Sequence, residues 1–170
     1  MVFASVLRGI VFNINYSYIF SEAKYPRTII ESTWNPDTFE YSFKNIDDYY
    51  TAPLVFQPRN ILNLSTGYEY KKFFARLSML YQEKVFQGPS FWPELVNYSD
   101  NYLRWDLSIK QGLPWYGIQV FCNLNNITNA KDILRNVGSG YVSSMQHYGR
   151  TIDLGIRWNF EQKKDKDTTP

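Results

Sequence analysis

The chain has 170 residues, which suits one domain and is too short for two large ones. Its formal net charge is only +2, which gives no indication of a nucleic-acid partner, and its lone cysteine, Cys122, excludes an internal disulfide. The sequence contains no run of about 18 apolar residues, which excludes a transmembrane helix.

The first predicted strand spans roughly residues 6–22. Large apolar side chains occupy every second position from Ile10 to Phe20, with mostly small and polar residues between them. This period of two is that of a β-strand with one apolar face. The polar stretch 23–57 follows. In it the segments 27–34 and 38–44 flank Asn-Pro-Asp, which predicts a hairpin outside the main sheet.

Five more segments alternate in the same way, and short turns and long loops join them in turn. The segments are 59–70, 73–86, 101–112, 117–128 and 148–160; the short turns are 71–72 and 113–117, and the long loops are 87–100 and 129–146. The sequence thus predicts six strands of 12 to 16 residues. Strands in soluble sheets usually have about 5–6 residues.

Strands of this length with one continuous apolar face require a thick apolar neighbour. A tilted strand crosses a bilayer in about 9–11 residues, and in lipid only a closed antiparallel barrel satisfies the backbone. Short turns on one side and long loops on the other are typical of outer-membrane barrels, where the turns are periplasmic and the loops extracellular. The sequence therefore predicts an all-β fold, a segment of an antiparallel transmembrane β-barrel in the cell outer membrane.

Two bands of aromatic residues flank the apolar centres of the predicted strands. Such bands are typical of the girdles that barrels place at lipid headgroups. The band near the short turns comprises Tyr68, Tyr70, Phe73, Trp115, Tyr116, Trp158 and Phe160, and the band near the long loops comprises Tyr18, Phe20, Phe86, Tyr102 and Tyr148. A cross-strand aromatic ladder in a soluble sheet is the alternative.

Four segments carry a resemblance to a known family. "RNILNLSTGYEYKKFFARLSMLYQ" and "NYLRWDLSIKQGL" resemble its strand units, "VFCNLNNITNAKD" resembles an Asn-Leu-x-Asn-Leu-Thr-Asn segment near the end of its barrel, and "YGRTIDLGIRWNF" resembles its closing strand with a terminal aromatic residue. Over roughly residues 7–160 the chain resembles the C-terminal end of a TonB-dependent outer-membrane receptor of the Bacteroidetes type.

The resemblance implies nutrient uptake through a barrel of about 22 strands, with energy supplied by TonB through an N-terminal plug domain. The sequence shows neither a plug, a TonB box nor a good signal peptide, so we expect a C-terminal piece of a longer receptor. In that piece, 1–160 belongs to the barrel and 161–170 is a disordered polar tail. Phe160 matches the closing aromatic residue that the barrel-assembly machinery recognises in the family, although here a tail follows it.

The sequence contains no catalytic constellation and no metal or cofactor motif, so we expect neither enzymatic activity nor a cofactor. The charged residues predicted to face the barrel lumen are Glu69, Arg76, Arg104, Asp106, Lys110, Asp153 and Arg157. They pair with one another across neighbouring strands, or they contact a plug or a solute. Loops 23–57, 87–100 and 129–146 are expected to face the unidentified nutrient, and the apolar face is expected to contact outer-membrane lipid.

Two other functions stay open. A standalone small outer-membrane barrel requires 27–34 and 38–44 to span as well, which would give eight strands, enough to close. A soluble barrel that binds a small molecule would turn its apolar face inward and expose a face rich in lysine and glutamate. The polar face here consists mostly of asparagine, serine, glycine, threonine and glutamine, which suits an enclosed wet interior better.

Overall fold

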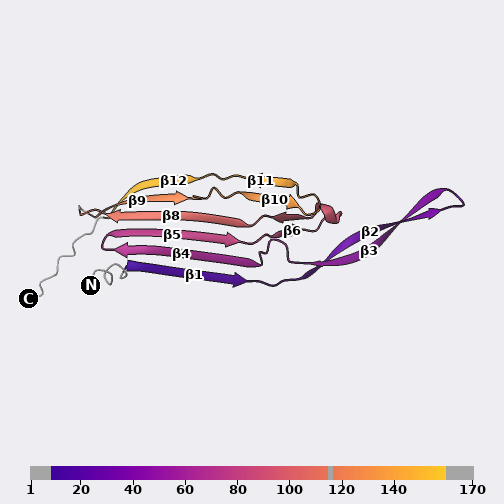
Figure 1. Ribbon diagram of the computed structural model, residues 1–170, viewed down its shortest axis with the longest axis horizontal. Helices are drawn as coiled ribbons and strands as arrows, with labels where there is room; N and C mark the ends of the chain where they lie inside the picture. The colour runs from indigo at the N-terminus through magenta and orange to yellow at the C-terminus, as the bar shows by residue number, and fades with distance from the viewer. Residues whose placement is uncertain (1–8, 115–116, 160–170) are drawn as a thin grey trace, which may run out of the picture.

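The structure is a computed structural model, and it describes residues 9–114 and 117–159. These residues form three antiparallel β-sheets and contain no α-helix (Figure 1). A short 3₁₀ helix, η2 (Pro93–Leu95), lies in one of the long loops. The all-β antiparallel fold predicted from the alternation of residues is confirmed.

A six-stranded sheet forms the body of the molecule, in the order β1-β4-β5-β8-β9-β12. Its strands are β1 (Ile10–Tyr18), β4 (Asn60–Tyr70), β5 (Phe73–Gln82), β8 (Tyr102–Gly112), β9 (Ile118–Asn125) and β12 (Thr151–Trp158). All six predicted strands are therefore present in one sheet. Their predicted lengths of 12 to 16 residues are wrong, because the strands have 8 to 11 residues and the chain then leaves the sheet.

The cross-strand register keeps one face of this sheet apolar. One row across all six strands contains Ile10, Tyr68, Ala75, Ile109, Cys122 and Leu154. A neighbouring row on the opposite, polar face contains Val11, Gly67, Arg76, Ser108, Asn123 and Asp153. A slip of one residue between any two strands would mix these rows, so the alternation in the sequence fixes the register.

The short turns depend on residues with positive φ. Lys71, between β4 and β5, has a φ of 55°, which lets the chain reverse at once. Gly117, before β9, has a φ of 69°. Its carbonyl oxygen accepts a hydrogen bond from the Asn159 backbone at 3.1 Å, and a Cβ there would lie 2.4 Å from the Asn159 carbonyl oxygen. Only glycine fits at position 117.

A two-stranded hairpin extends beyond the long-loop end of the six-stranded sheet (Figure 1). It consists of β2 (Ala23–Asn35) and β3 (Glu40–Ala52), which pair with each other over their full lengths. The predicted hairpin outside the main sheet is confirmed. Its strands are longer than the predicted segments 27–34 and 38–44.

A four-stranded sheet, in the order β11-β10-β7-β6, occupies the regions that the sequence analysis describes only as long loops. Its strands are β6 (Phe86–Gly88), β7 (Asn97–Ser99), β10 (Asp132–Asn136) and β11 (Val142–Gln146). Two of these strands have three residues and two have five. Such short strands do not produce a recognisable alternation of polar and apolar residues in the sequence.

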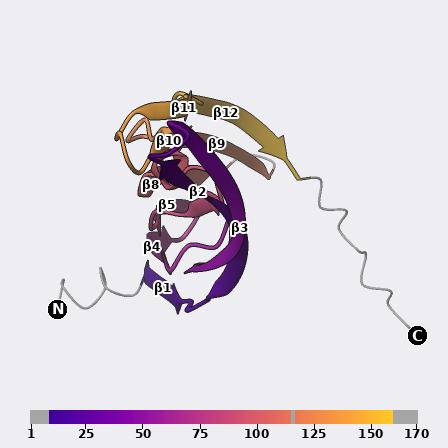
Figure 2. The same cartoon turned by 90° about the vertical axis from the view of Figure 1, so that its right-hand side faces the viewer.

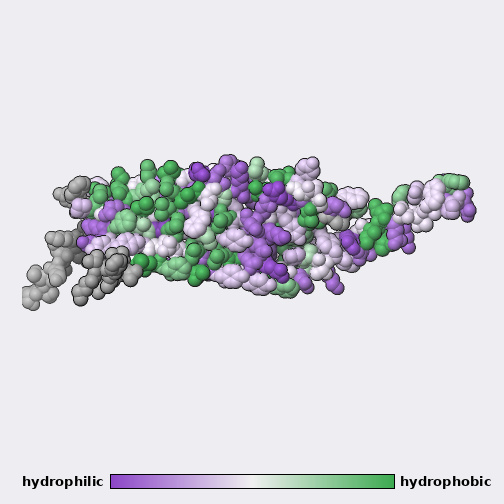
Figure 3. Space-filling model, in the orientation of Figure 1, coloured by the Kyte–Doolittle hydropathy of each residue, from purple (hydrophilic) through white to green (hydrophobic). Residues whose placement is uncertain are grey.

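The apolar face of the six-stranded sheet is not covered by any part of the described chain. Apart from Pro58, Val85 and Phe86 are the only apolar side chains that are buried among the described residues. At the two outer strands, Ile14 is 63% exposed and Leu154 is 76% exposed. On the side shown in Figure 3, hydrophobic residues are most frequent over this sheet, and hydrophilic residues gather toward its junction with the smaller sheets.

One predicted member of the aromatic bands is placed wrongly. The alternation of residues predicts Phe86 at the end of a membrane-facing strand, but its side chain is only 2% exposed. It belongs to β6 and not to β5, and its ring packs against those of Tyr25 and Tyr98. Because the chain leaves the main sheet after Gln82, the alternation does not continue as far as Phe86.

The six-stranded sheet curves into an open arc and does not close (Figure 2). Within the described residues, its edge strands β1 and β12 each pair on one side only. No helix in the described part of the chain is long and apolar enough to cross a membrane. Several predictions concern Trp115, Tyr116, Phe160 and the tail 161–170, and these positions lie outside the described residues.

Candidate functional site

The seven charged residues predicted to face a lumen all lie on the polar face of the six-stranded sheet. Glu69 and Arg76 come from β4 and β5, Arg104, Asp106 and Lys110 from β8, and Asp153 and Arg157 from β12. They share their register rows mainly with asparagine, serine, glutamine, glycine and phenylalanine. The structure therefore gathers on one surface the residues that the sequence selects.

One ion pair forms within this set. Arg104 Nε donates to Asp106 Oδ2 at 3.0 Å, and both residues belong to β8. Asp153 accepts a hydrogen bond from the Asn125 side chain at 2.9 Å. Within the described ranges 9–114 and 117–159, no ion pair joins members of the set on neighbouring strands. The predicted alternative of pairing across strands is therefore unsupported.

A hollow of about 470 Å³ lies against the polar face. Its polar lining consists of Asn13, Asn15, Asn63, Ser65, Ser78, Arg104 and Asp106. These residues come from β1, β4, β5 and β8, so the recessed surface extends over four adjacent strands. The polar face is the recessed face of the sheet in this region.

Two phenylalanines interrupt the polar face. The ring of Phe74 lies 5.1 Å from the guanidinium carbon of Arg76 and 5.4 Å from the ammonium nitrogen of Lys110. Both cations thus contact one aromatic ring, an arrangement that stabilises positive charge without a carboxylate. Phe121 is the cross-strand partner of Gly155, and a Cβ on that glycine would lie 2.3 Å from the phenylalanine ring.

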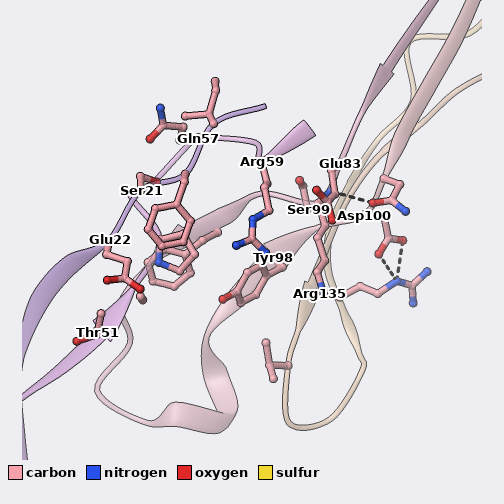
Figure 4. Close-up of a pocket in the computed structure, with 18 of the residues that line it drawn as sticks. Ser21, Glu22, Thr51, Gln57, Arg59, Glu83, Tyr98, Ser99, Asp100 and Arg135 are labelled. Atoms are coloured by element: carbon pink, nitrogen blue, oxygen red, sulfur yellow. Dashed lines mark hydrogen bonds and ion pairs between the residues drawn. The ribbon is translucent and has the colours of Figure 1, made fainter. Parts of the chain in front are cut away.

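A larger cavity, of about 650 Å³, lies where the six-stranded sheet meets the two smaller sheets, and we call it the junction cavity (Figure 4). It is lined by 19–22, 51–53, Gln57, Arg59, Glu83, Lys84, Phe86, 98–101 and 135–137. All three loop regions that the sequence predicts to face a substrate contribute to it. Segments far apart in the sequence thus converge on one recess at one end of the main sheet.

Aromatic rings form part of the junction cavity wall and join it to the hairpin. Phe86 lies 5.6 Å from Tyr25 and 5.4 Å from Tyr98 between ring centres, and Tyr25 lies 5.8 Å from Tyr50. Burial raises the pKa of Tyr50, and its hydroxyl has no hydrogen-bond partner in the described chain. This cluster holds the base of the hairpin against the four-stranded sheet.

Two carboxylates at the junction cavity already have partners. Arg135 Nε donates to both carboxylate oxygens of Asp100, at distances of 3.0 and 2.8 Å. Glu83 accepts a hydrogen bond from the side-chain amide of Asn60. In Figure 4 the Asp100–Arg135 pair lies on one side of the cavity, and Arg59 lies between this pair and Glu22.

Other polar groups of the junction cavity have no such partner. The Arg59 guanidinium carbon lies 5.7 Å from the ring centres of both Tyr18 and Phe20. No ion pair or side-chain hydrogen bond joins Arg59 to another described residue. The carbonyl oxygen of the Gln57 side chain is buried without a hydrogen-bond partner among the described residues.

The sequence predicted the loops of this cavity, and it placed Phe20 and Phe86 in an aromatic band, but it did not indicate Arg59, Lys84 or Gln57 as binding residues. Arg59 is the first residue of the predicted strand 59–70, and no local pattern distinguishes it from other charged residues. Its environment depends on Tyr18 and Phe20, which are distant in sequence and become neighbours only because β1 pairs with β4. A cavity assembled through such long-range pairing is not visible in local periodicity.

The chemistry available at the junction cavity is that of non-covalent binding. It combines cationic donors, amide and carboxylate acceptors and aromatic rings. In the part of the chain that the structure describes, no group of three or more His, Cys, Asp and Glu residues is placed to hold a metal ion.

Comparisons with protein-family models, curated proteins and solved structures find no match to this chain.

Proposed function

We propose that this chain forms part of the wall of a transmembrane β-barrel in the cell outer membrane, as the C-terminal barrel segment of a TonB-dependent receptor for nutrient uptake. The six-stranded sheet would cross the lipid with its apolar face outward. The short turns would lie in the periplasm, and the hairpin and the four-stranded sheet would lie outside the cell. The proposal combines the sequence resemblance with the surface chemistry of the sheet.

The observation that carries the proposal is the exposure of the apolar face. Ile152, Leu154, Ile156 and Trp158 on β12 are between 55% and 76% exposed, and the alternating residues of β1 are similarly exposed. A soluble barrel would bury these side chains around a pocket. Water makes such a continuous apolar surface unfavourable, at about 25 cal/mol per Å² of exposed apolar area, whereas lipid does not.

The free edges of β1 and β12 also support a larger barrel. Lipid offers no hydrogen bonds to unpaired backbone groups, so a spanning sheet must close. Because the sheet has six strands, β1 and β12 run in opposite directions, and additional strands can continue the antiparallel order from either edge. The partners implied are outer-membrane lipid, the barrel-assembly machinery acting on Phe160, TonB through a plug domain, and a nutrient ligand.

The standalone eight-stranded barrel receives less support. It requires the segments of β2 and β3 to join the membrane-spanning sheet. In the described chain these two strands pair only with each other, in a separate hairpin that extends past the end of the sheet. The hairpin also carries the charged residues Arg27, Glu31, Lys44, Asp47 and Asp48, which do not suit a lipid-facing position.

Cell fractionation tests the proposed location. The full chain, produced with an outer-membrane targeting sequence and together with the further strands that complete the barrel, is expected in the detergent-soluble outer-membrane fraction. It should resist extraction by carbonate, and deletion of Phe160 should reduce its assembly there. Recovery of folded chain in the detergent-free soluble fraction would contradict the proposal.

A further inference from the structure

We propose that the junction cavity binds a ring-bearing carboxylate, with Arg59 as the residue that contacts the carboxylate. The biological purpose of this inference rests on the proposed function, because the cavity is lined by the loops that would face the nutrient. The inference states the chemical class of that nutrient. Its physical basis is separate, since it depends only on the groups that line the cavity. Those groups are Arg59, Lys84, Gln57 and the rings of Phe20 and Tyr98.

Arg59 is prepared to bind an oxyanion. Its guanidinium lies over the rings of Tyr18 and Phe20, with both ring centres 5.7 Å from the guanidinium carbon. Contact with ring faces leaves the N–H groups at the edge of the guanidinium plane free to donate. No carboxylate of the described chain forms an ion pair with it. A carboxylate ligand would accept two parallel hydrogen bonds from this edge.

The other charges of the cavity leave room for an anion. Asp100 is held by Arg135 through two hydrogen bonds, so its charge is compensated within the protein. Lys84 is a second cation without an ion pair in the described chain, and it lies 5.9 Å from the ring centre of Tyr98. Glu83 accepts a hydrogen bond from the neutral side-chain amide of Asn60 and keeps its negative charge, and Glu22 is exposed. These two carboxylates oppose an anion, so binding depends on Arg59 and Lys84.

The rest of the cavity suits a ring with polar substituents. Phe20 and Tyr98 supply aromatic surface, against which a flat or hydrophobic ring face can stack. The buried Gln57 carbonyl oxygen has no donor among the described residues, and a buried acceptor of this kind calls for one. A ligand hydroxyl would supply it. The volume of about 650 Å³ lies within the usual range for small-molecule sites.

The test measures binding of matched probes to the full chain in detergent micelles by isothermal titration calorimetry. Glucuronate and glucose share a sugar ring and differ in the carboxylate, while benzoate supplies a carboxylate on an aromatic ring without hydroxyls. We expect glucuronate to bind at least tenfold more tightly than glucose, because hydrogen bonds between a guanidinium and a carboxylate are stronger than those between neutral groups. If benzoate binds and glucuronate does not, the ligand is still a carboxylate, and its ring is aromatic rather than a sugar.

Three variants separate the charge from the geometry. Arg59→Gln should abolish the preference for glucuronate over glucose, and Arg59→Lys should retain only part of it, because lysine lacks the paired donors. Glu22→Gln should strengthen glucuronate binding several-fold, since it removes an opposing charge. Arg59 and Glu22 are both exposed, so the variants should keep the melting temperature of the parent chain, and this is measured alongside.

Two outcomes overturn the inference. Equal affinities for glucuronate and glucose, unchanged in the Arg59→Gln variant, would show that the cavity does not recognise a carboxylate. If no probe binds while the chain is folded, the cavity is not a binding site for this class of ligand. Because the titration is done in micelles, neither outcome bears on cellular location, and a negative fractionation experiment would leave the titration valid.

Discussion

Gly155 on β12 lies directly opposite Phe121 on β9, and the two residues depend on each other. The ring lies over the glycine so closely that a Cβ there would be 2.3 Å from it. This explains an irregularity of the sequence, because Phe121 falls among polar residues on the polar face. The large Phe121 side chain fits because Gly155, its partner on the neighbouring strand, has no side chain.

Gly155→Ala is therefore expected to destabilise the sheet. The added methyl group must displace the Phe121 ring, and overpacking of this kind costs about 1–3 kcal/mol. The free energy of unfolding is measured in detergent by urea titration. The double variant Gly155→Ala/Phe121→Ala should show less than the sum of the two single losses, because it removes the clash. Additive losses would show that the two side chains do not interact.

Asn126 is the one buried polar residue in the described chain, with 6% of its surface exposed. Its φ of 54° is left-handed, a conformation that asparagine tolerates better than most residues. Its backbone N–H donates to Asp106 at 2.8 Å, and its side-chain amide donates to the carbonyl oxygens of Gly149 at 2.8 Å and Ala130 at 3.2 Å. It therefore joins β8, β9 and the segment leading into β12.

Substitution of Asn126 by alanine and by glycine separates these two roles. Both variants lose the side-chain hydrogen bonds, at about 1–3 kcal/mol of unfolding free energy, whereas only alanine adds about 1 kcal/mol of strain at positive φ. The order of stability should be parent, Asn126→Gly, Asn126→Ala, as measured by thermal unfolding. If both variants melt like the parent, Asn126 does not organise this end of the six-stranded sheet.

At the scale of an element, one ion pair links the two strands of the hairpin. Arg27 and Asp48 are cross-strand partners, with Arg27 Nε 2.7 Å from Asp48 Oδ2. The hydrogen bond from Arg27 lowers the pKa of Asp48 below its ordinary value of 3.8, and a backbone hydrogen bond from Tyr49 adds to this. A lowered pKa means that the contribution to stability is present above the ordinary value and is lost as the pH falls through the folded-state pKa.

The hairpin should therefore loosen at acidic pH, in a range that begins just below pH 4. Spin labels on Thr33 and Ser42, which are cross-strand partners, report the separation of the strands. The distance distribution should broaden as the pH falls from 6 to 3, while Asp48→Asn should give one unchanged distribution over that range. A distribution in the parent chain that does not respond to pH would show that Asp48 does not hold the strands together.

The alternation of residues predicts the long elements and misses the short ones, for a physical reason. β4, β5 and β8 each place several apolar residues on one face, so their period is clear. β6 and β7 have three residues each, and their pairing depends on contacts of Phe86 with Tyr98 and of Val85 with Ser99. The residues of the junction cavity are missed for the same reason, because chain segments distant in sequence bring them together.

At the scale of the molecule, the two faces of the six-stranded sheet differ in what they require from their surroundings. The polar face is recessed, and it keeps several charged residues without carboxylate partners in the described chain. The apolar face lacks any covering layer, and the edges of β1 and β12 are open. A bilayer on one side and an enclosed aqueous interior on the other would satisfy both faces, provided that further strands complete the barrel.

Two adjacent positions on β1 test this assignment directly. Ile14 is 63% exposed on the apolar face, and Asn15, also exposed, lines the hollow on the polar face. In lipid, Ile14→Arg should lower the unfolding free energy by about 2–4 kcal/mol, because the charge would face hydrocarbon, whereas Asn15→Arg should change it by less than about 0.5 kcal/mol. Folding into lipid vesicles is followed by urea titration. In a water-soluble protein both side chains would face solvent, and the two substitutions would have equal and small effects. Equal stabilities of the two variants would therefore contradict the membrane assignment, because only a low-dielectric surrounding on one side distinguishes two exposed neighbours.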